Sequence, residues 1–343
     1  MRRHVRRIQF TGRSSYIVTL PKSWVLLHGL KERDQVLIEE RGSVLVIKPL
    51  KVPEISRERV AVIEVSRDPE STARRIIAAY VMGYNRITVR GVIDASTRNA
   101  IRETVLRKLP GVEIISEGDS EVTLQVLLDY RSMSLSSAVE RLVKVTSSVL
   151  KDTCTALSRA DKVLAREIVR EDDSVDRAYF YVIRLINYMA TGLHEIPSEL
   201  TFVDLLAYRS VSKLIERIGD HAANIARYTL ELSEAREEFA EASEICMFAR
   251  EIFEKGSTAF FSKNPLVVDE IAVDVDTLKT RERSLLERFS SRITAKDLVA
   301  LKMILESIRR IAEYSRDIAE IALDLAIGSL AISQEEQLDL QAR

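Results

Sequence analysis

Several acidic side chains in the middle of the chain have a spacing that suits metal binding. Glu216 and Asp220 lie four residues apart in a segment of helical periodicity, so both carboxylates would lie on one helix face. Asp172 and Asp176 repeat that spacing on the preceding predicted helix, with Asp173 beside them. If these helices pack antiparallel, the carboxylates converge, and such a density of like charge needs a cation or an arginine among them.

The residue types narrow the choice of ion. Carboxylate oxygens suit hard cations such as Mg²⁺, Ca²⁺ or Mn²⁺, and Fe or Zn becomes suitable if His221 joins the set. Gly219, Ala222 and Ala223 are small enough for a neighbouring helix to approach closely. The alternative is an ordinary solvated helix face, with His221 held by a hydrogen bond.

Basic residues mark the start of the chain and precede the first acidic residue, Glu32. The formal net charge of the chain is −1, so the rest is correspondingly acidic, and this asymmetry indicates a polyanionic partner. A targeting presequence or a solvated end is the alternative, but the arginines run into strand-like sequence. The candidate DNA-binding residues are Arg2, Arg3, Arg6, Arg7, Arg13 and Lys22.

Residues 1–50 have the pattern of short strands around one short helix. Pro21 suits the start of a helical turn and Gly29 suits its end. A hairpin is predicted around Arg41-Gly42. The predicted strands are Val5 to Phe10, Tyr16 to Leu20, Gln35 to Glu40 and Ser43 to Lys48.

Residues 51–130 predict a small α/β region in the order β-α-β-α-β-β. They hold no glycine-rich phosphate loop and no catalytic constellation, which favours a linking or oligomerising role. The predicted strands are Val60 to Val65, Arg86 to Val89, Val112 to Ile115 and Val122 to Leu127, and the predicted helices are Pro69 to Met82 and Asp94 to Lys108.

Residues 131–330 carry apolar residues at helical spacing almost throughout. Polar breaks near 158–161, 192–198, 233–236, 264–265 and 290–294 predict about six helices of roughly 25–35 residues, enough for an all-α bundle. Residues 331–343 are expected to form a C-terminal tail.

A repeat is visible within this helical region. Thr201 to Ala207 resembles Thr294 to Ala300, and in the same register Ile215 to Asp220 lies over Ile308 to Glu313. The alternative is a chance match between amphipathic helices. The shared Thr, Asp and Leu at the helix starts favour a duplication, which predicts two three-helix units at residues ~135–232 and ~236–328.

The two cysteines, Cys154 and Cys246, lie in apolar helical segments without paired metal-ligand spacing or a disulfide framework. Buried free thiols in a cytoplasmic protein are therefore expected. No signal peptide pattern is present, and no apolar run approaches the ~20 residues of a spanning helix, so we expect no membrane insertion.

The first 50 residues resemble the AbrB-like (SpoVT-AbrB, MazE-type) swapped-hairpin family. The match lies in Gly12-Arg13, Ile17-Val18-Thr19-Leu20, Pro21-Lys22-Ser23-Trp24, Leu27, Gly29-Leu30-Lys31, Asp34-Gln35-Val36 and Val44 to Pro49. This resemblance implies a β-barrel made by two interlaced chains, which presents basic residues to DNA. Arg7 and Arg13 match the positions of such contacts, and Lys22 less closely. Many members have an acidic residue where this chain has Gln9-Phe10-Thr11, so the preferred DNA sequence does not carry over.

The segment Glu216 to Ala226, together with the predicted three-helix units, looks like the PhoU family of phosphate-signalling proteins. The resemblance implies acidic motifs that bind metal ions on the bundle surface, and contact with a phosphate transporter or signalling protein. The metal candidates are Asp172, Asp173, Asp176, Glu216, Asp220 and His221. In the second unit Arg309 replaces the glutamate, so a second full site is doubtful and Arg309 is expected to pair with Glu313.

These features predict a multidomain transcriptional regulator of phosphate uptake or homeostasis, which forms a homodimer or a higher homo-oligomer. Its helical region would be a metal-binding sensor or a docking module. The alternative is a phosphate-signalling adaptor that binds a transporter or kinase and uses residues 1–50 only to dimerise. An enzyme is not expected, since the Glu-x-x-His pairs of a di-iron centre and any Ser–His–Asp or Cys–His arrangement are missing.

Overall fold

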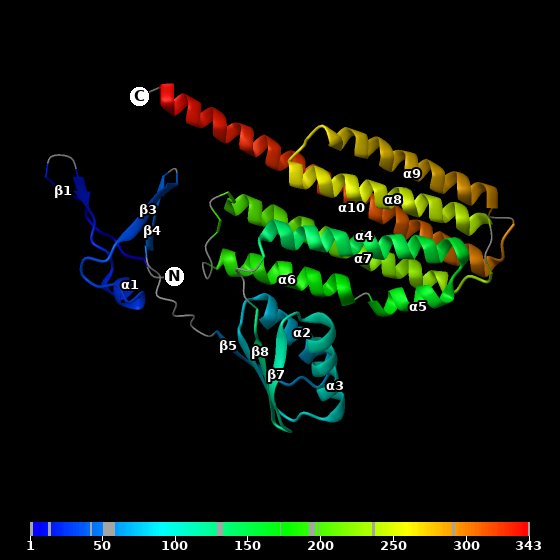
Figure 1. The fold of residues 1–343 in the computed structure, drawn as a ribbon, viewed down its shortest axis with the longest axis horizontal. Coiled ribbons are helices and arrows are strands. Elements are labelled where there is room, and N and C mark those ends of the chain that lie inside the picture. Colours follow the sequence, from blue (N-terminus) through cyan, green and yellow to red (C-terminus); the bar gives the residue numbers. More distant parts are fainter. Residues whose placement is uncertain are drawn as a thin grey trace. The chain divides into compact units, whose positions relative to one another are not determined.

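The computed structural model describes residues 3–12, 15–41, 43–50, 59–128, 133–171, 173–191, 196–197, 199–234, 237–289 and 292–341 (Figure 1). The chain forms two compact units, Met1–Glu58 and Arg59–Arg343. None of the described helices combines the length and the apolar run that a membrane crossing needs.

The N-terminal unit consists of two hairpins and one short helix. Strand β1 pairs antiparallel with β2, and β3 pairs antiparallel with β4. Gly12 follows β1 with a φ of +65° and Gly29 follows the helix with a φ of +64°, left-handed conformations that favour glycine. The elements are β1 (Gln9–Thr11), β2 (Ser15–Ile17), α1 (Lys22–Leu27), β3 (Val36–Arg41) and β4 (Val44–Pro49).

The first two strands are shorter than the sequence predicts. Val5 to Phe10 and Tyr16 to Leu20 have strand-like composition, yet only Gln9–Thr11 and Ser15–Ile17 are paired. A strand exists only where a neighbouring strand accepts its hydrogen bonds. Within the described part of this single chain, residues 3–8 and 18–20 have no such neighbour.

The larger unit begins with a four-stranded mixed sheet in the order β5-β6-β8-β7. Strands β5 and β6 are parallel, as a helical crossover connection requires, and the other pairs are antiparallel. Helices α2 and α3 pack their apolar faces on one side of the sheet, with Ile76, Tyr80 and Ile101 fully buried. The elements are β5 (Val60–Glu64), α2 (Pro69–Val81), β6 (Arg86–Arg90), α3 (Ala95–Glu103), a π-helical turn η1 (Thr104–Lys108), β7 (Val112–Glu117) and β8 (Glu121–Val126). The predicted β-α-β-α-β-β order is confirmed.

Seven helices follow among the described residues. They are α4 (Leu135–Arg159), α5 (Lys162–Glu171), α6 (Asp173–Ala190), α7 (Phe202–Thr229), α8 (Glu237–Ser262), α9 (Val267–Phe289) and α10 (Ala295–Gln341). Their ends fall at the predicted breaks. The structure differs in extending α10 through the segment expected to be a tail, and α5 and α6 lie on either side of Asp172, which is outside the described residues.

Polar side chains fix several of these helix ends. Thr201 and Asp204 form a reciprocal capping box at the start of α7. Thr294 caps α10 in a similar way, since its hydroxyl accepts the amide of Asp297 at 3.1 Å. Helix α4 ends at Ala160 in the left-handed conformation, and Asp161 then accepts amides from the first turn of α5.

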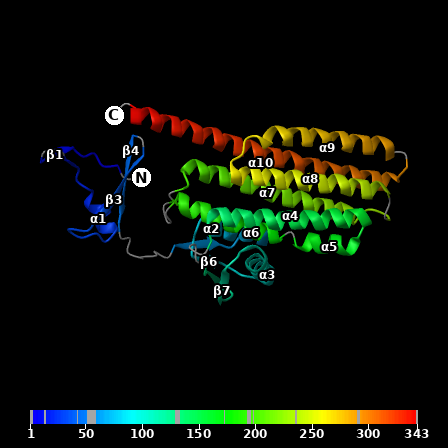
Figure 2. The same cartoon turned by 45° about the horizontal axis from the view of Figure 1, so that its top comes forward.

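Helices α4, α7, α8 and α10 lie side by side and share one apolar core (Figures 1 and 2). Helix α6 packs on α4 and α7, α5 packs on the same pair, and α9 packs on α8 and α10. Two glycines permit close approach between these helices. A Cβ at Gly219 would meet Val175 of α6 at 2.8 Å, and one at Gly256 would meet the carbonyl oxygen of Ser315 in α10 at 2.6 Å.

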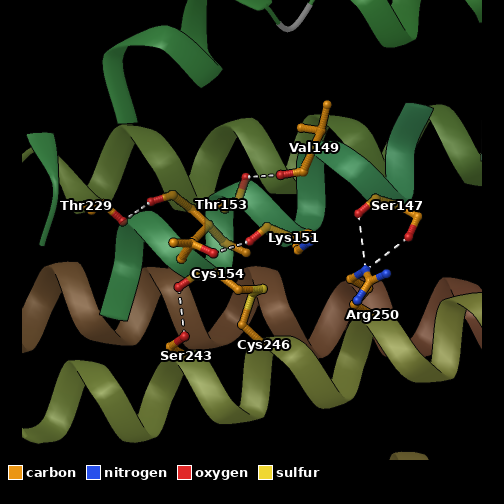
Figure 3. The surroundings of a disulfide bond; sticks show 11 residues. Ser147, Val149, Lys151, Thr153, Cys154, Thr229, Ser243, Cys246 and Arg250 are labelled. Carbon is orange, nitrogen blue, oxygen red and sulfur yellow. Dashed lines mark hydrogen bonds between the residues drawn. A yellow bond between two sulfur atoms is a disulfide. The ribbon is translucent and has the colours of Figure 1, made fainter. Parts of the chain in front are cut away.

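A disulfide joins Cys154 of α4 to Cys246 of α8, which corrects the expectation of free thiols (Figure 3). The two residues are 92 positions apart in the sequence, but the side-by-side packing of α4 and α8 brings their Cα atoms to 5.6 Å. Both cysteines are buried, and Ser243 of α8 donates a hydrogen bond to the carbonyl of Cys154 at 2.7 Å. The bond therefore covalently links the two halves of the helical core.

Reduction of this disulfide is expected to lower the free energy of unfolding by roughly 2–5 kcal/mol, because the cross-link restricts the unfolded chain over a long loop. Equilibrium unfolding in guanidinium with and without a thiol reductant measures the difference. The Cys154→Ala/Cys246→Ala variant is the control, since its midpoint should not respond to reductant. An unchanged midpoint for the unsubstituted chain would contradict the cross-link.

Candidate nucleic-acid interface and acidic helix surface

The predicted DNA-binding side chains that the structure describes are all exposed on the N-terminal unit. They are Arg3, Arg6, Arg7 and Lys22, whereas Arg2 and Arg13 lie outside the described residues. Arg6 donates to the carbonyl of its neighbour Val5 at 3.0 Å. Among the described residues, none of the four forms an ion pair with an acid, unlike Lys48, which meets Glu39 at 2.6 Å. Their charge is thus available to an anion such as phosphate.

The same unit lacks a buried core in the single chain. No described residue between 3 and 50 is buried, and the exposed fractions of Val5, Ile8 and Tyr16 are 92%, 71% and 73%. An apolar hollow of about 490 Å³ is lined by helix α1 and strand β4, with Trp24, Leu27 and other residues on its walls. A module of this size needs further apolar contacts to be stable.

The acidic residues predicted on α6 are paired with basic residues of the α/β region. Lys108 donates to Asp176 at 3.0 Å and lies 3.6 Å from Asp173, and Arg107 lies 3.5 Å from Asp173. Burial lowers the pKa of Lys108, but its contacts with Asp176 and Asp173 outweigh this and leave the pKa raised. Asp172 lies outside the described residues.

The packing of α6 against α7 places Glu216 and Asp176 close enough to Tyr179 for both charges to affect the pKa of its hydroxyl. Burial raises the pKa of Tyr179, Lys213 lowers it, and the charges of Glu216 and Asp176 raise it. Glu216 accepts a hydrogen bond from Lys213 at 2.5 Å, and that ammonium lies 5.3 Å from the centre of the Tyr179 ring. The predicted approach of α6 and α7 at Gly219 is confirmed, but a lysine lies beside the acids there.

His221 lies at another contact, between α7 and α10. Its ring centre is 5.8 Å from that of Tyr314, and its Nδ1 atom is buried with no hydrogen-bond partner among the described residues. Burial lowers the pKa of His221, the nearby Arg310 and Arg217 lower it further, and Glu306 opposes them. His221 and the α6 acids therefore have different neighbours.

The described residues do not gather into a metal site. No group of three or more His, Cys, Asp or Glu side chains in this part of the chain could hold an ion. Asp173 and Asp176 are occupied by Lys108 and Arg107, and Glu216 by Lys213. The metal ion thus stays a prediction without support from the described geometry.

In the second half of the helical region, an arginine lies among acids. Arg309 of α10 meets Glu306, lies 2.8 Å from Glu313 and 3.8 Å from Glu282 of α9. The predicted pairing of Arg309 with Glu313 is confirmed. Arg309 lowers the pKa of Glu306 through a hydrogen bond, while burial raises the pKa of Glu282.

Sequence reasoning missed the residues that join the α/β region to the helices. Arg184 of α6 is fully buried, donates to the carbonyl of Tyr80 and lies 4.7 Å from the centre of its ring. One turn further along α6, Asn187 donates to the carbonyl of Val81 at 2.8 Å. An arginine at a core-facing position of a helix, as Arg184 is, was the one available signal.

Comparison with known families identifies two domains in the chain. A PhoU domain matches residues 139–229, and the family described as antidote-toxin recognition MazE, bacterial antitoxin, matches residues 9–54. Both domains were expected from the sequence, and both are shown.

Curated relatives match part of the helical region. The phosphate-specific transport system accessory protein PhoU of Escherichia coli is 39% identical over 92 residues, which is 26% of this chain and 36% of that protein. A PhoU homolog from a Burkholderia species is 33% identical over 95 residues, 27% of this chain and 38% of the relative. The chain thus spans little more than a third of the length of these relatives.

Solved structures share the fold over a longer part of the chain than the curated relatives match. PhoU from Pseudomonas aeruginosa aligns with a TM-score of 0.51 at 20% identity, covering 57% of this chain and 96% of that one. The phosphate transport system regulatory protein PhoU from Streptococcus pneumoniae aligns with a TM-score of 0.50 at 18% identity, covering 57% and 94%. This coverage is too large for residues 139–229 alone, so more of the chain shares the fold.

Replacing Arg309 with methionine is expected to destabilise the protein by about 1–2 kcal/mol at neutral pH, because partly buried acids lose their cation. The lowered pKa of Glu306 sets the sign of the pH dependence. Such a group stabilises the fold above its ordinary pKa of 4.5 and loses that contribution as the pH falls through the lowered value. The difference between variant and unsubstituted chain should therefore shrink in acid.

Denaturant unfolding at several pH values measures this effect. Arg283→Met is the matched control, since Arg283 is exposed on α9 and has no ion pair among the described residues. A pH-independent difference, or an equal loss in the control, would show that the acids around Arg309 do not depend on it.

Proposed function

We propose that this chain is a DNA-binding transcriptional regulator of phosphate uptake, since one chain carries both a PhoU domain and a MazE-type domain. The relatives matched by the first domain are named as accessory proteins of phosphate-specific transport. The N-terminal unit that contains the MazE-type domain supplies the exposed Arg3, Arg6 and Arg7, which no acid in the described residues neutralises. This combination carries the proposal, and it assigns the chain a regulatory and not a catalytic role.

The N-terminal unit would act as a dimer of interlaced hairpins. Its apolar side chains are exposed in the single chain, including Val5, Ile8 and Tyr16, and an apolar hollow lies beside α1. A second copy would cover these side chains and supply hydrogen-bond partners for residues 3–8 and 18–20. Burial of apolar surface of this extent is the usual source of stability in a small β module.

Dimerisation would also double the basic charge that faces DNA. Arg3, Arg6, Arg7 and Lys22 of two copies would suit contacts to phosphate oxygens, which position a protein on the duplex without reading its sequence. Arg2 and Arg13 belong to the same proposed set.

The helical region would consist of two related units, α4 to α7 and α8 to α10, in which α5 and α6 together take the place of one helix of a three-helix unit. The offset that relates Thr201 to Thr294 also relates His221 to Tyr314 and Arg217 to Arg310. His221 and Tyr314 face each other between α7 and α10, and Arg217 lies 5.7 Å from the centre of the Tyr314 ring. Equivalent residues that meet across a helix pair are what a two-fold related duplication produces.

Of the two roles predicted for the helical region, we favour docking of a transport or signalling protein over metal sensing. Asp173, Asp176 and Glu216 already have basic partners within the chain. Apolar side chains are exposed at the start of α7, namely Phe202, Val203 and Leu206. Exposed apolar groups in proximity are typical of protein–protein contacts.

The full chain should bind duplex DNA with strong salt dependence, which fluorescence anisotropy at 50 to 200 mM salt measures. If two copies neutralise ~6–10 phosphates, affinity falls about 10³–10⁵-fold over that range. Joint replacement of Arg3, Arg6 and Arg7 by alanine removes two copies of each charge. Each lost phosphate contact reduces the slope of log K against log salt by about 0.9.

The matched control removes the same charge from helix α5 through Lys162→Ala, Arg166→Ala and Arg170→Ala, and should bind DNA as the unsubstituted chain does. No retention of the full chain on duplex DNA at low salt would refute the DNA-binding role. A chain that fails to bind DNA but remains dimeric would instead favour the adaptor function.

A further inference from the structure

The four-stranded sheet has two edges, and they differ in how they are protected. Strands β5 and β7 are the outer strands among the described residues. An exposed edge presents unpaired backbone N–H and C=O groups, which attract another strand unless charges, bulges or a cover prevent it. The contrast between these two edges indicates which one is available for a partner.

The β7 edge carries two protective features. A register irregularity between Ile114 and Ser116 interrupts its regular pairing with β8. Acidic side chains occur at both ends of the strand: Glu113 is exposed, and Glu117 accepts hydrogen bonds from Arg98 and Arg102. A bulged, acidic edge disfavours the addition of a further strand.

The β5 edge has a regular backbone. The carbonyl of Arg59 accepts the amides of Asn85 and Arg86 at the start of β6, and the amide of Val65 donates to the carbonyl of Arg90. Alternate residues from 59 to 65 therefore face β6. The N–H and C=O groups of Val60, Val62 and Glu64 therefore face outward.

The side chains of β5 make this edge apolar at its centre. Val60 and Val62 are 48% and 53% exposed, on the sheet face away from α2 and α3, and Glu64 follows them at the end of the strand. A short, regular strand with exposed β-branched residues and an open edge is suited to edge-to-edge pairing.

We propose that β5 pairs antiparallel with β5 of a second copy about a two-fold axis at Val62, which joins the two sheets into one. Val62 would lie opposite its own counterpart and exchange both backbone hydrogen bonds with it. Val60 of each copy would lie opposite Glu64 of the other. The strand is thus complementary to itself.

Charge supports a second copy in this orientation. Val60 of β5 lies beside Arg86 of β6 in the sheet register. Glu64 of the second copy would lie on the other side of Val60, so that Glu64, Val60 and Arg86 occupy neighbouring positions on three adjacent strands. Neighbouring strands are about 4.8 Å apart, which brings the carboxylate within reach of the arginine side chain across the small valine. Parallel pairing in register would instead place the two Glu64 side chains together, which is unfavourable.

This contact does not depend on DNA binding. The β5 contact lies in the unit Arg59–Arg343, whereas an N-terminal dimer would form through the unit Met1–Glu58. Each can therefore be present without the other, and the test below is made without DNA.

Cysteine cross-linking in the full chain tests the register. Both native cysteines are engaged in the buried disulfide, so an introduced cysteine is the only free thiol. With Val62→Cys, the two Cα atoms would be about 5.5 Å apart, within the range of a disulfide, and mild oxidation should give covalent dimer. With Val60→Cys, the two thiols would be displaced by about 13 Å along the strands, and covalent dimer should be about tenfold less abundant.

The Val60→Cys variant controls for chance collisions between two chains that are held together elsewhere, because Val60 is similarly exposed and lies only two residues from Val62. Equal cross-linking of the two variants would overturn the proposal, since chance collision of tethered chains would then explain both. No cross-linking of Val62→Cys would overturn it too, even if the DNA-binding results come out as proposed above.

Hydrogen exchange of the unsubstituted chain provides a second measurement. The outward amides of Val60, Val62 and Glu64 should be protected, and Val62→Lys should abolish that protection by opposing two like charges across the axis. The control Glu113→Lys, on the other edge, should leave it unchanged. Fast exchange of the three amides in the unsubstituted chain would refute the pairing. Protection that survives in Val62→Lys would assign the edge to a different partner.

Discussion

The close packing of α4, α7, α8 and α10 is the constraint on which the larger unit depends. Gly219 and Gly256 permit the approach of α6 to α7 and of α8 to α10, because any side chain there would meet Val175 or the Ser315 carbonyl. The same packing brings Cys154 and Cys246 to bonding distance. With α4 and α7 fixed, α6 has a defined position, and α6 in turn holds the α/β region through Arg184 and Asp176.

The N-terminal unit shows the opposite situation. Its strands β3 and β4 carry continuous apolar runs, Val36 to Ile38 and Val44 to Ile47, yet no described side chain in the unit is buried. Apolar residues in a strand indicate that their side chains need to be buried, but they do not indicate whether the same chain or a second copy buries them. A strand-like sequence likewise does not indicate which chain supplies the neighbouring strand. Residues 5–8 and 18–20 have no neighbouring strand within the described part of this single chain.

Local features of the fold followed from the sequence, and long-range contacts did not. The order of the α/β elements, the helix breaks and the pairing of Arg309 with Glu313 depend on neighbours within one helix or strand. The contact of Lys108 with Asp176 joins residues 68 positions apart, and the disulfide joins residues 92 positions apart. Spacing along one chain carries no signal for either, so the acids of α6 suggested a metal where the fold supplies a lysine.

Internal cations change what the acidic helix surface can recognise. A carboxylate that already has Lys108, Lys213 or Arg309 beside it gains less from a metal ion or a basic partner, because the partner must first displace a charge that is covalently part of the fold. The docking proposed for the helical region would then depend on groups that have no such partner, and exposed apolar side chains such as Phe202 and Leu206 are of this kind. A partner bound there can alter the rest of the protein only if its affinity differs between two arrangements of the helices. Helix α6, which contacts both α7 and the α/β region, is positioned to transmit such a difference to the sheet.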